Sequence, residues 1–158
     1  MRYFILTTSL LVNTLLLASN AADQQVTLNV GSFDSISVPS GALSLTVSTA
    51  TAGSEPESAT TSSSITYLST TANAKKIVGT VASLPASTTL ALQVNPVEGS
   101  HGTSAGSVSL SSSAQDLLTA IPQFTLGDST TSFSFTAPVA AGSFSGANAT
   151  VTLTIQAN

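Results

Sequence analysis

Apolar residues alternate with small polar residues along most of the chain, and this period of two predicts β-strands. Leu43, Leu45 and Val47 alternate with Ser and Thr in this way. Each such strand has one apolar face and one face of hydroxyl groups, and the branched Cβ of Thr suits the pleat. The pattern predicts about ten strands, at residues 26–30, 35–38, 43–47, 64–68, 76–83, 89–94, 106–110, 123–126, 132–136 and 150–155.

Short strands separated by Gly, Pro and Asn at this even spacing are typical of β-sandwiches and barrels. We therefore expect one all-β domain, with long loops at residues 49–63 and 95–105.

A single segment favours a helix. Ser113–Ile121 places Leu117, Leu118 and Ile121 at helical spacing, which predicts one or two helical turns that end before Pro122.

The first residues resemble an export signal. Arg2 supplies a positive charge, residues 4–17 are largely apolar, and Ser19 and Ala21 are the small residues that a signal peptidase requires. The apolar stretch is short for a bilayer span, which needs about 20 residues. We expect a signal peptide at residues 1–21 and a mature β-sandwich domain at residues 22–158, with no stable membrane span after cleavage.

The mature chain then begins with an alternating strand at residues 22–30, whose apolar row is Val26, Leu28 and Val30. Such a strand either pairs within its own sheet or leaves and pairs with a neighbouring copy. In the second case these three side chains would make the subunit contact. A head-to-tail exchange of this kind does not close, so it produces a filament.

The composition excludes several functions. Ser and Thr make up about a third of the residues, charged residues make up 6%, and the net charge is −4. Two Lys and one Arg provide no basic surface for nucleic acid. The absence of Cys excludes a disulfide framework and a thiolate metal site. A hydrophobic content of 42% and a mean hydropathy of +0.39 argue against disorder.

Candidate catalytic groups are few, and we expect no enzyme, no cofactor and no metal site. The one His of the chain, His101, lies in a Gly-rich polar loop, where a solvated turn residue is a simpler interpretation than the base of a hydrolytic triad. Glu55 and Glu57 flank a proline in a polar loop, where solvated carboxylates are the simpler interpretation. The isolated acids do not form an Asp-x-Asp-x-Asp-Gly calcium loop. Several of them could still gather around a calcium ion, and the sequence leaves such weak binding open. Asn148 begins a glycosylation sequon, whose use depends on the source.

Several segments resemble exported bacterial β-proteins. The similarity covers about 95 residues from Ile65 onward and rests on the segments 65–67, 74–81, 84–90, 102–110, 114–121, 141–146 and 151–155. The closing pattern, Ala141–Gly146 followed by Val151–Ile155, is similar to the last strand of Cys-free major fimbrial subunits of the colonisation-factor (alpha-fimbrial) type and of spore-coat-U-like secreted proteins. The chain departs from the spore-coat-U group in lacking Cys, and residues 49–63 match neither group.

This resemblance implies a single immunoglobulin-like β-sandwich of about 8–10 strands. It also implies a structural subunit of an extracellular or cell-surface filament, a pilus or fimbria, that polymerises by exchange of its N-terminal donor strand. The partner would be a second copy of the chain, with a periplasmic chaperone or assembly protein as a further partner. The alternative is a monomeric secreted binding module or adhesin domain, in which residues 22–30 stay in their own sheet.

Overall fold

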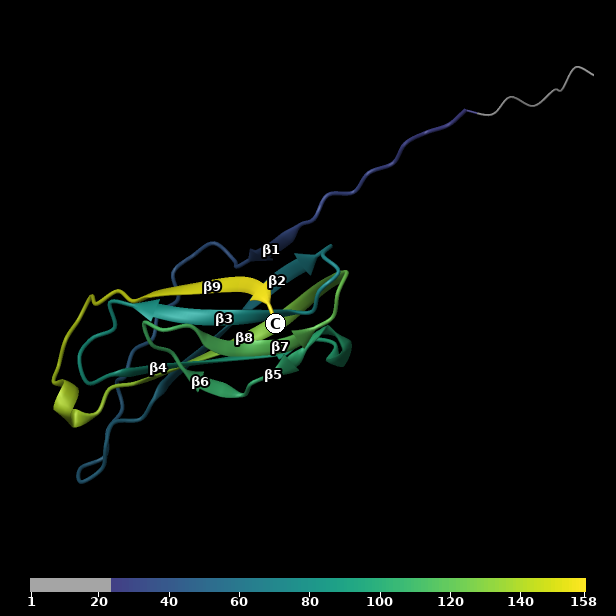
Figure 1. Ribbon diagram of the computed structural model, residues 1–158. Coiled ribbons are helices and arrows are strands. Elements are labelled where there is room, and N and C mark those ends of the chain that lie inside the picture. The colour runs from purple at the N-terminus through teal and green to yellow at the C-terminus, as the bar shows by residue number, and fades with distance from the viewer. Residues whose placement is uncertain (1–23) are drawn as a thin grey trace, which may run out of the picture. The chain divides into compact units, whose positions relative to one another are not determined.

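The computed structural model describes residues 24–158 (Figure 1). The chain divides into two units, Met1–Val30 and Gly31–Asn158, and all strands described below belong to the second. The expected signal peptide and residues 22 and 23 lie outside the described residues. Within the first unit, residues 24–30 form no strand, although their alternation predicts one.

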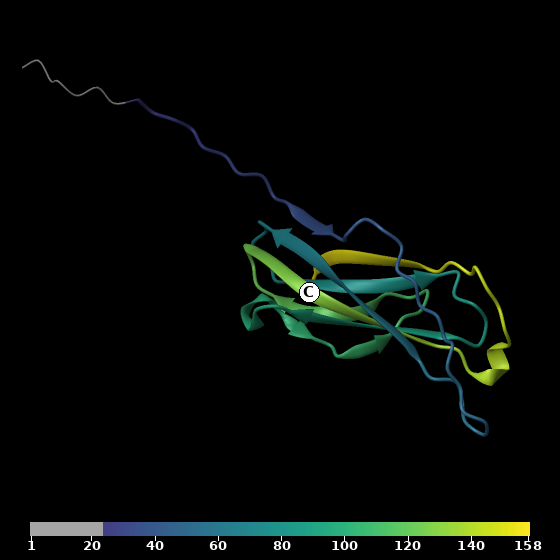
Figure 2. The same cartoon turned by 180° about the vertical axis from the view of Figure 1, so that it is seen from behind.

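Within residues 24–158, nine strands form two antiparallel sheets, which lie face to face in Figures 1 and 2. The first sheet has the order β1 (Asp34–Ser37), β2 (Ala59–Ser69), β8 (Thr125–Thr136), β4 (Thr89–Pro96) and β6 (Ser107–Ser109). The second has the order β5 (Thr103–Ser104), β7 (Gln115–Ile121), β3 (Lys75–Ala82) and β9 (Thr150–Ala157). Two short 3₁₀ turns, η1 (Gly99–His101) and η2 (Val139–Ala141), lie in the connections. The expected all-β sandwich is confirmed.

The core lies between the sheets and is made by the alternating apolar positions. On β4, the side chains of Leu90, Leu92 and Val94 are buried, while the residues between them are more exposed. The opposing sheet contributes Ile77 and Val81 from β3. The buried apolar cluster is completed by Ile65, Tyr67, Leu110, Leu117, Leu118 and Ile121.

The helix expected at residues 113–121 is wrong, because residues 115–121 form β7. Two bulges interrupt the pairing of β7 with β3: Ile77 pairs with Leu118, whereas Val78 pairs with Asp116. A bulge inserts an extra residue and so turns consecutive side chains to one face. This explains why both Leu117 and Leu118 are buried, which locally imitates helical spacing.

Other strand predictions change in extent. The strands expected at 123–126 and 132–136 are one continuous strand, β8, and β2 begins five residues before the expected start at residue 64. Residues 43–47 form no strand, although the pattern predicts one. Figure 2 shows this segment crossing from the end of β1 toward the turn before β2. Leu45 nevertheless packs against the core.

Candidate functional site

The most distinctive surface of the domain is the free edge of β9. This strand pairs with β3 over its whole length, from Thr150–Ala82 to Ala157–Lys75. Within residues 24–158, no segment pairs with its other edge. A free edge exposes a row of backbone N–H and C=O groups that can bind another strand.

The inward side chains of β9 are only half-buried. Val151, Leu153 and Ile155 pack against the core but keep partial exposure, whereas Ile77, which pairs with Ile155, is completely buried. The core is therefore covered incompletely along this side of the second sheet. An additional strand beside β9 would remove more of this apolar surface from water, which favours binding.

The neighbouring edge of the first sheet is short. β1 has four residues, pairs with β2 on one side, and lies next to β9 without a backbone ladder between them. Ile36 of β1 is half-buried against the same core. The free edge of β9, together with the half-buried side chains of β9 and Ile36, is called the open side below. It combines unpaired backbone with incompletely covered apolar side chains.

The predicted donor residues lie in the other unit. Val26, Leu28 and Val30 are 66%, 85% and 84% exposed. Such exposure is unusual for three apolar side chains in one alternating row, since apolar residues are normally the most buried. Residues 24–30 form no strand, and the three side chains of their apolar row are exposed.

A charged cluster fixes the start of β1. Lys75 Nζ donates to Asp34 Oδ2 at 2.8 Å, and the hydroxyl of Ser69 donates to Asp34 Oδ1 at 2.7 Å. These hydrogen bonds, that from Lys75 first, lower the pKa of the Asp34 carboxyl below its usual value. Lys75 is 6% exposed, so its ammonium group depends on this carboxylate for a charged partner. The cluster joins β1 of one sheet to β3 of the other.

His101 lies in a loop where its contacts are with Tyr67 and Glu98. Its backbone C=O accepts a 2.7 Å hydrogen bond from the hydroxyl of Tyr67, and its Nε2 lies 3.8 Å from a carboxylate oxygen of Glu98. Burial raises the pKa of the Tyr67 hydroxyl. Glu55 is bonded elsewhere, accepting from the backbone N–H of Val139 at 2.7 Å. These contacts supply neither a nucleophile–base pair nor paired carboxylates.

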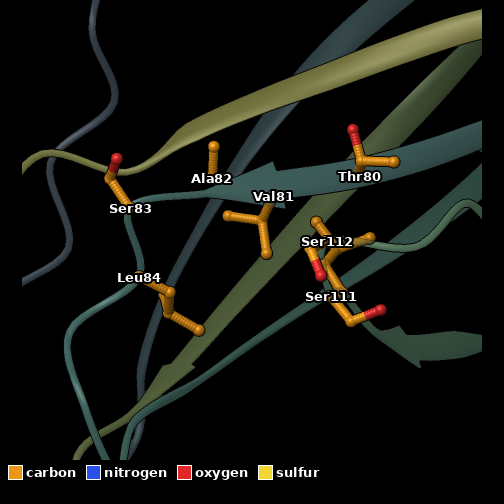
Figure 3. A pocket seen from close by; sticks show the side chains of 8 residues that line it. Thr80, Val81, Ala82, Ser83, Leu84, Ser111 and Ser112 are labelled. Atoms are coloured by element: carbon orange, nitrogen blue, oxygen red, sulfur yellow. The ribbon is translucent and has the colours of Figure 1, made fainter.

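A shallow hollow lies where β3 ends (Figure 3). Apolar side chains of Val81, Leu84 and Leu110 line it. The remaining lining residues are small Ala82 and the hydroxyl residues Thr80, Ser83, Ser111 and Ser112. None of these side chains is titratable or aromatic, so the hollow offers no acid–base group and no stacking surface. In the described part of the chain, no three His, Asp or Glu residues are grouped so that they could hold a metal ion.

Comparisons with protein-family models, with curated proteins and with solved structures gave no match for this chain. Among residues 24–158, no helix has the length and apolar character needed to cross a membrane.

Proposed function

We propose that this protein is a structural subunit of an extracellular or cell-surface filament, in which the N-terminal strand of one copy adds to β9 of the next. The observation that carries this proposal is the open side: a full-length strand with one unpaired edge, above apolar side chains that its own domain covers only in part.

The strand order supports this assignment. In an immunoglobulin-type sandwich, one sheet has the order A-B-E-D and the other contains C-F-G. Here β1-β2-β8-β4 corresponds to A-B-E-D and β3-β9 corresponds to C-F, with strands β5, β6 and β7 inserted between D and E. The unpaired edge of β9 is therefore the place where strand G would lie.

The proposed donor row has the matching chemistry. Val26, Leu28 and Val30 alternate with polar residues, as a strand needs when one face covers a core and the other faces water. In β-strand addition, backbone hydrogen bonds supply affinity and alternate side chains fill apolar positions. Val151, Leu153 and Ile155 repeat the same spacing on the acceptor side.

Because the donor and acceptor surfaces differ, each copy keeps one free donor and one free acceptor after every addition. Such a heterologous contact extends into a filament unless its rotation closes a ring. The low charge suits this, since 6% charged residues produce little repulsion between packed copies. The same open edge favours aggregation before assembly. A periplasmic chaperone or another assembly protein that covers it is therefore part of the proposal, as is export.

The test is negative-stain electron microscopy of residues 22–158 beside a variant that lacks residues 22–30. We expect filaments from the first and soluble monomers from the second. Leu28→Asp should also abolish filaments, because it places a charge in the donor row. Thr27→Asp is its matched control on the opposite face of the same segment and should retain them.

Monomers from the unmodified chain would contradict the filament proposal. If deletion of residues 22–30 then only lowers the melting temperature, the segment completes its own sandwich. The monomeric binding module or adhesin domain would in that case be the better assignment.

A further inference from the structure

A set of hydrogen bonds centred on Thr70 holds the first residues of the sandwich unit, Gly31 to Phe33. The backbone N–H of Phe33 donates to Thr70 Oγ1 at 2.7 Å, and this hydroxyl donates to the C=O of Gly31 at 3.0 Å. The backbone N–H of Thr70 donates to the C=O of Phe33 at 2.8 Å. Thr70 therefore binds the chain on both sides of residue 32.

Asp34, which follows Phe33, is also fixed by contacts with β2 and β3. Asp34 pairs with Ser69 in the β1–β2 ladder and carries the 2.8 Å contact to Lys75. We call Gly31, Phe33, Asp34, Ser69, Thr70 and Lys75 the root clamp. Together with the ladder it holds the backbone from Gly31 to Ser37 along the end of β2 and the turn that follows.

The position of the root clamp restricts where the donor row can go. Lys75 pairs with Ala157, so the clamp lies at the end of β9 where this strand finishes. A donor strand antiparallel to β9 would end with Val30 beside Thr150, about 23 Å from the clamp along the eight-residue strand β9. A donor strand parallel to β9 would end near the clamp, but the chain would then have to reverse before β1.

No spare residue lies between the donor row and the root clamp to connect a strand beside β9 with the start of β1. Val30, the last apolar residue of the donor row, is followed directly by Gly31, whose C=O is bound to Thr70. Even the tightest hairpin connection uses about two residues. Insertion of the row into its own β9 edge would therefore consume part of the row or break the clamp.

We propose that the root clamp prevents residues 24–30 from pairing with the β9 edge of their own copy and so directs them to a second copy. This inference rests on the proposed function, because it assumes that the row binds a β9 edge. It assigns a positioning role to Thr70 and to the Asp34–Lys75 pair, which lie outside the donor row and the acceptor strand.

The test inserts a flexible Gly/Ser linker of about twelve residues between Val30 and Gly31 of the chain 22–158. Such a linker reaches up to about 40 Å when extended, enough to return along β9. We expect this variant to be monomeric and to melt at a higher temperature than the variant lacking residues 22–30, because its own row completes the sandwich. The matched control carries the same linker after Gly53, in an exposed turn, and should still form filaments.

A second variant, Thr70→Val, removes the hydroxyl of the root clamp without adding length. We expect a larger monomer fraction than in the unmodified chain, measured by analytical ultracentrifugation, and no such change for Thr130→Val on an exposed face of β8.

The outcomes separate the two proposals. Filaments from the unmodified chain and equally from the linker variant would overturn the role of the root clamp and leave the filament function standing. Absence of filaments from the unmodified chain would remove the filament function, and this inference with it.

Discussion

Asp34 and Lys75 join the two sheets at one end of the sandwich, with 2.8 Å between Oδ2 and Nζ. They are separated by 41 residues in sequence. Asp34 begins β1 and Lys75 begins β3, so the pair holds the short edge strand to the opposite sheet. The same contact lies beside the end of β9, through the pairing of Lys75 with Ala157.

Acid should weaken the domain through this pair. The folded state lowers the pKa of Asp34 below its usual 3.8, so the stabilisation is complete well above pH 3.8 and is lost as the pH falls through the folded pKa. We expect the melting temperature of Asp34→Asn to be lower than that of the unmodified protein at pH 6, and the difference to shrink toward pH 2. Asp116→Asn, which breaks the exposed pair with Lys76, should show a smaller effect. Equal pH profiles for the two variants would contradict this role.

Two buried threonines of β8 should respond in opposite ways to the same substitution. The hydroxyl of Thr131 has no hydrogen-bond partner among the described residues, and the residue is 1% exposed. Thr131→Val should raise the free energy of unfolding by about 1 kcal/mol, because it removes an unsatisfied buried group. Thr125→Val should lower it by about 1 kcal/mol, because the Thr125 hydroxyl donates to the C=O of Pro122 at 2.6 Å. Urea denaturation measures both, and a loss of stability in Thr131→Val would show that its hydroxyl is satisfied.

Gly127 is required by the packing of Tyr67. A Cβ at this position would meet the Tyr67 ring and hydroxyl at 2.7–2.8 Å, so Gly127→Ala should cost about 1–3 kcal/mol of unfolding free energy. Gly99→Ala is the control, since a Cβ there meets nothing within 4 Å. Chemical denaturation of both variants is the measurement. A loss in Gly99→Ala as large as that in Gly127→Ala would point to backbone effects instead.

Tyr67 provides a spectroscopic probe of the core. Cleavage after residue 21 would remove Tyr3 and leave Tyr67 as the one tyrosine of the mature chain. Because burial raises its pKa above the usual 10.0, its ultraviolet ionisation should occur above pH 10 in the folded protein. Its neutral form contributes stability below pH 10, and this contribution is lost as the pH rises through the folded pKa. Tyr67→Phe should reduce the loss of unfolding free energy at alkaline pH, because no phenol remains to ionise. It should also lower the free energy of unfolding by about 1 kcal/mol at pH 7, because the hydrogen bond to the C=O of His101 is removed. Ionisation at an unshifted pKa in the folded protein would contradict its burial.

Most of the fold could be predicted from the pattern of apolar positions. Alternation at Leu90, Leu92 and Val94 predicts a strand with one buried face, which the structure has. The exceptions have local causes. The bulges of β7 place Leu117 and Leu118 on the same side, and this imitates the helical spacing that the sequence shows.

The candidate site could be predicted in part. Val26, Leu28 and Val30 are recognisable as an apolar row from sequence alone, and their role as donor remains a proposal. The free edge of β9, which we propose as the acceptor, could not be predicted, because residues 150–155 have the same alternating pattern as the other strands of the sandwich. The root clamp was also missed, since Thr70 is one of many hydroxyl residues and nothing nearby in sequence indicates its bonds to Gly31 and Phe33.

The sequence by itself determined the all-β class, the face of most strands that turns inward and the absence of thiol chemistry, because side-chain alternation and composition are local properties. Only the tertiary structure decided which strands pair, that residues 43–47 find no ladder partner, and that β9 keeps one edge free. The physical reason is that a strand is completed by hydrogen bonds to another segment, and which segment lies beside it depends on the packing of the whole core.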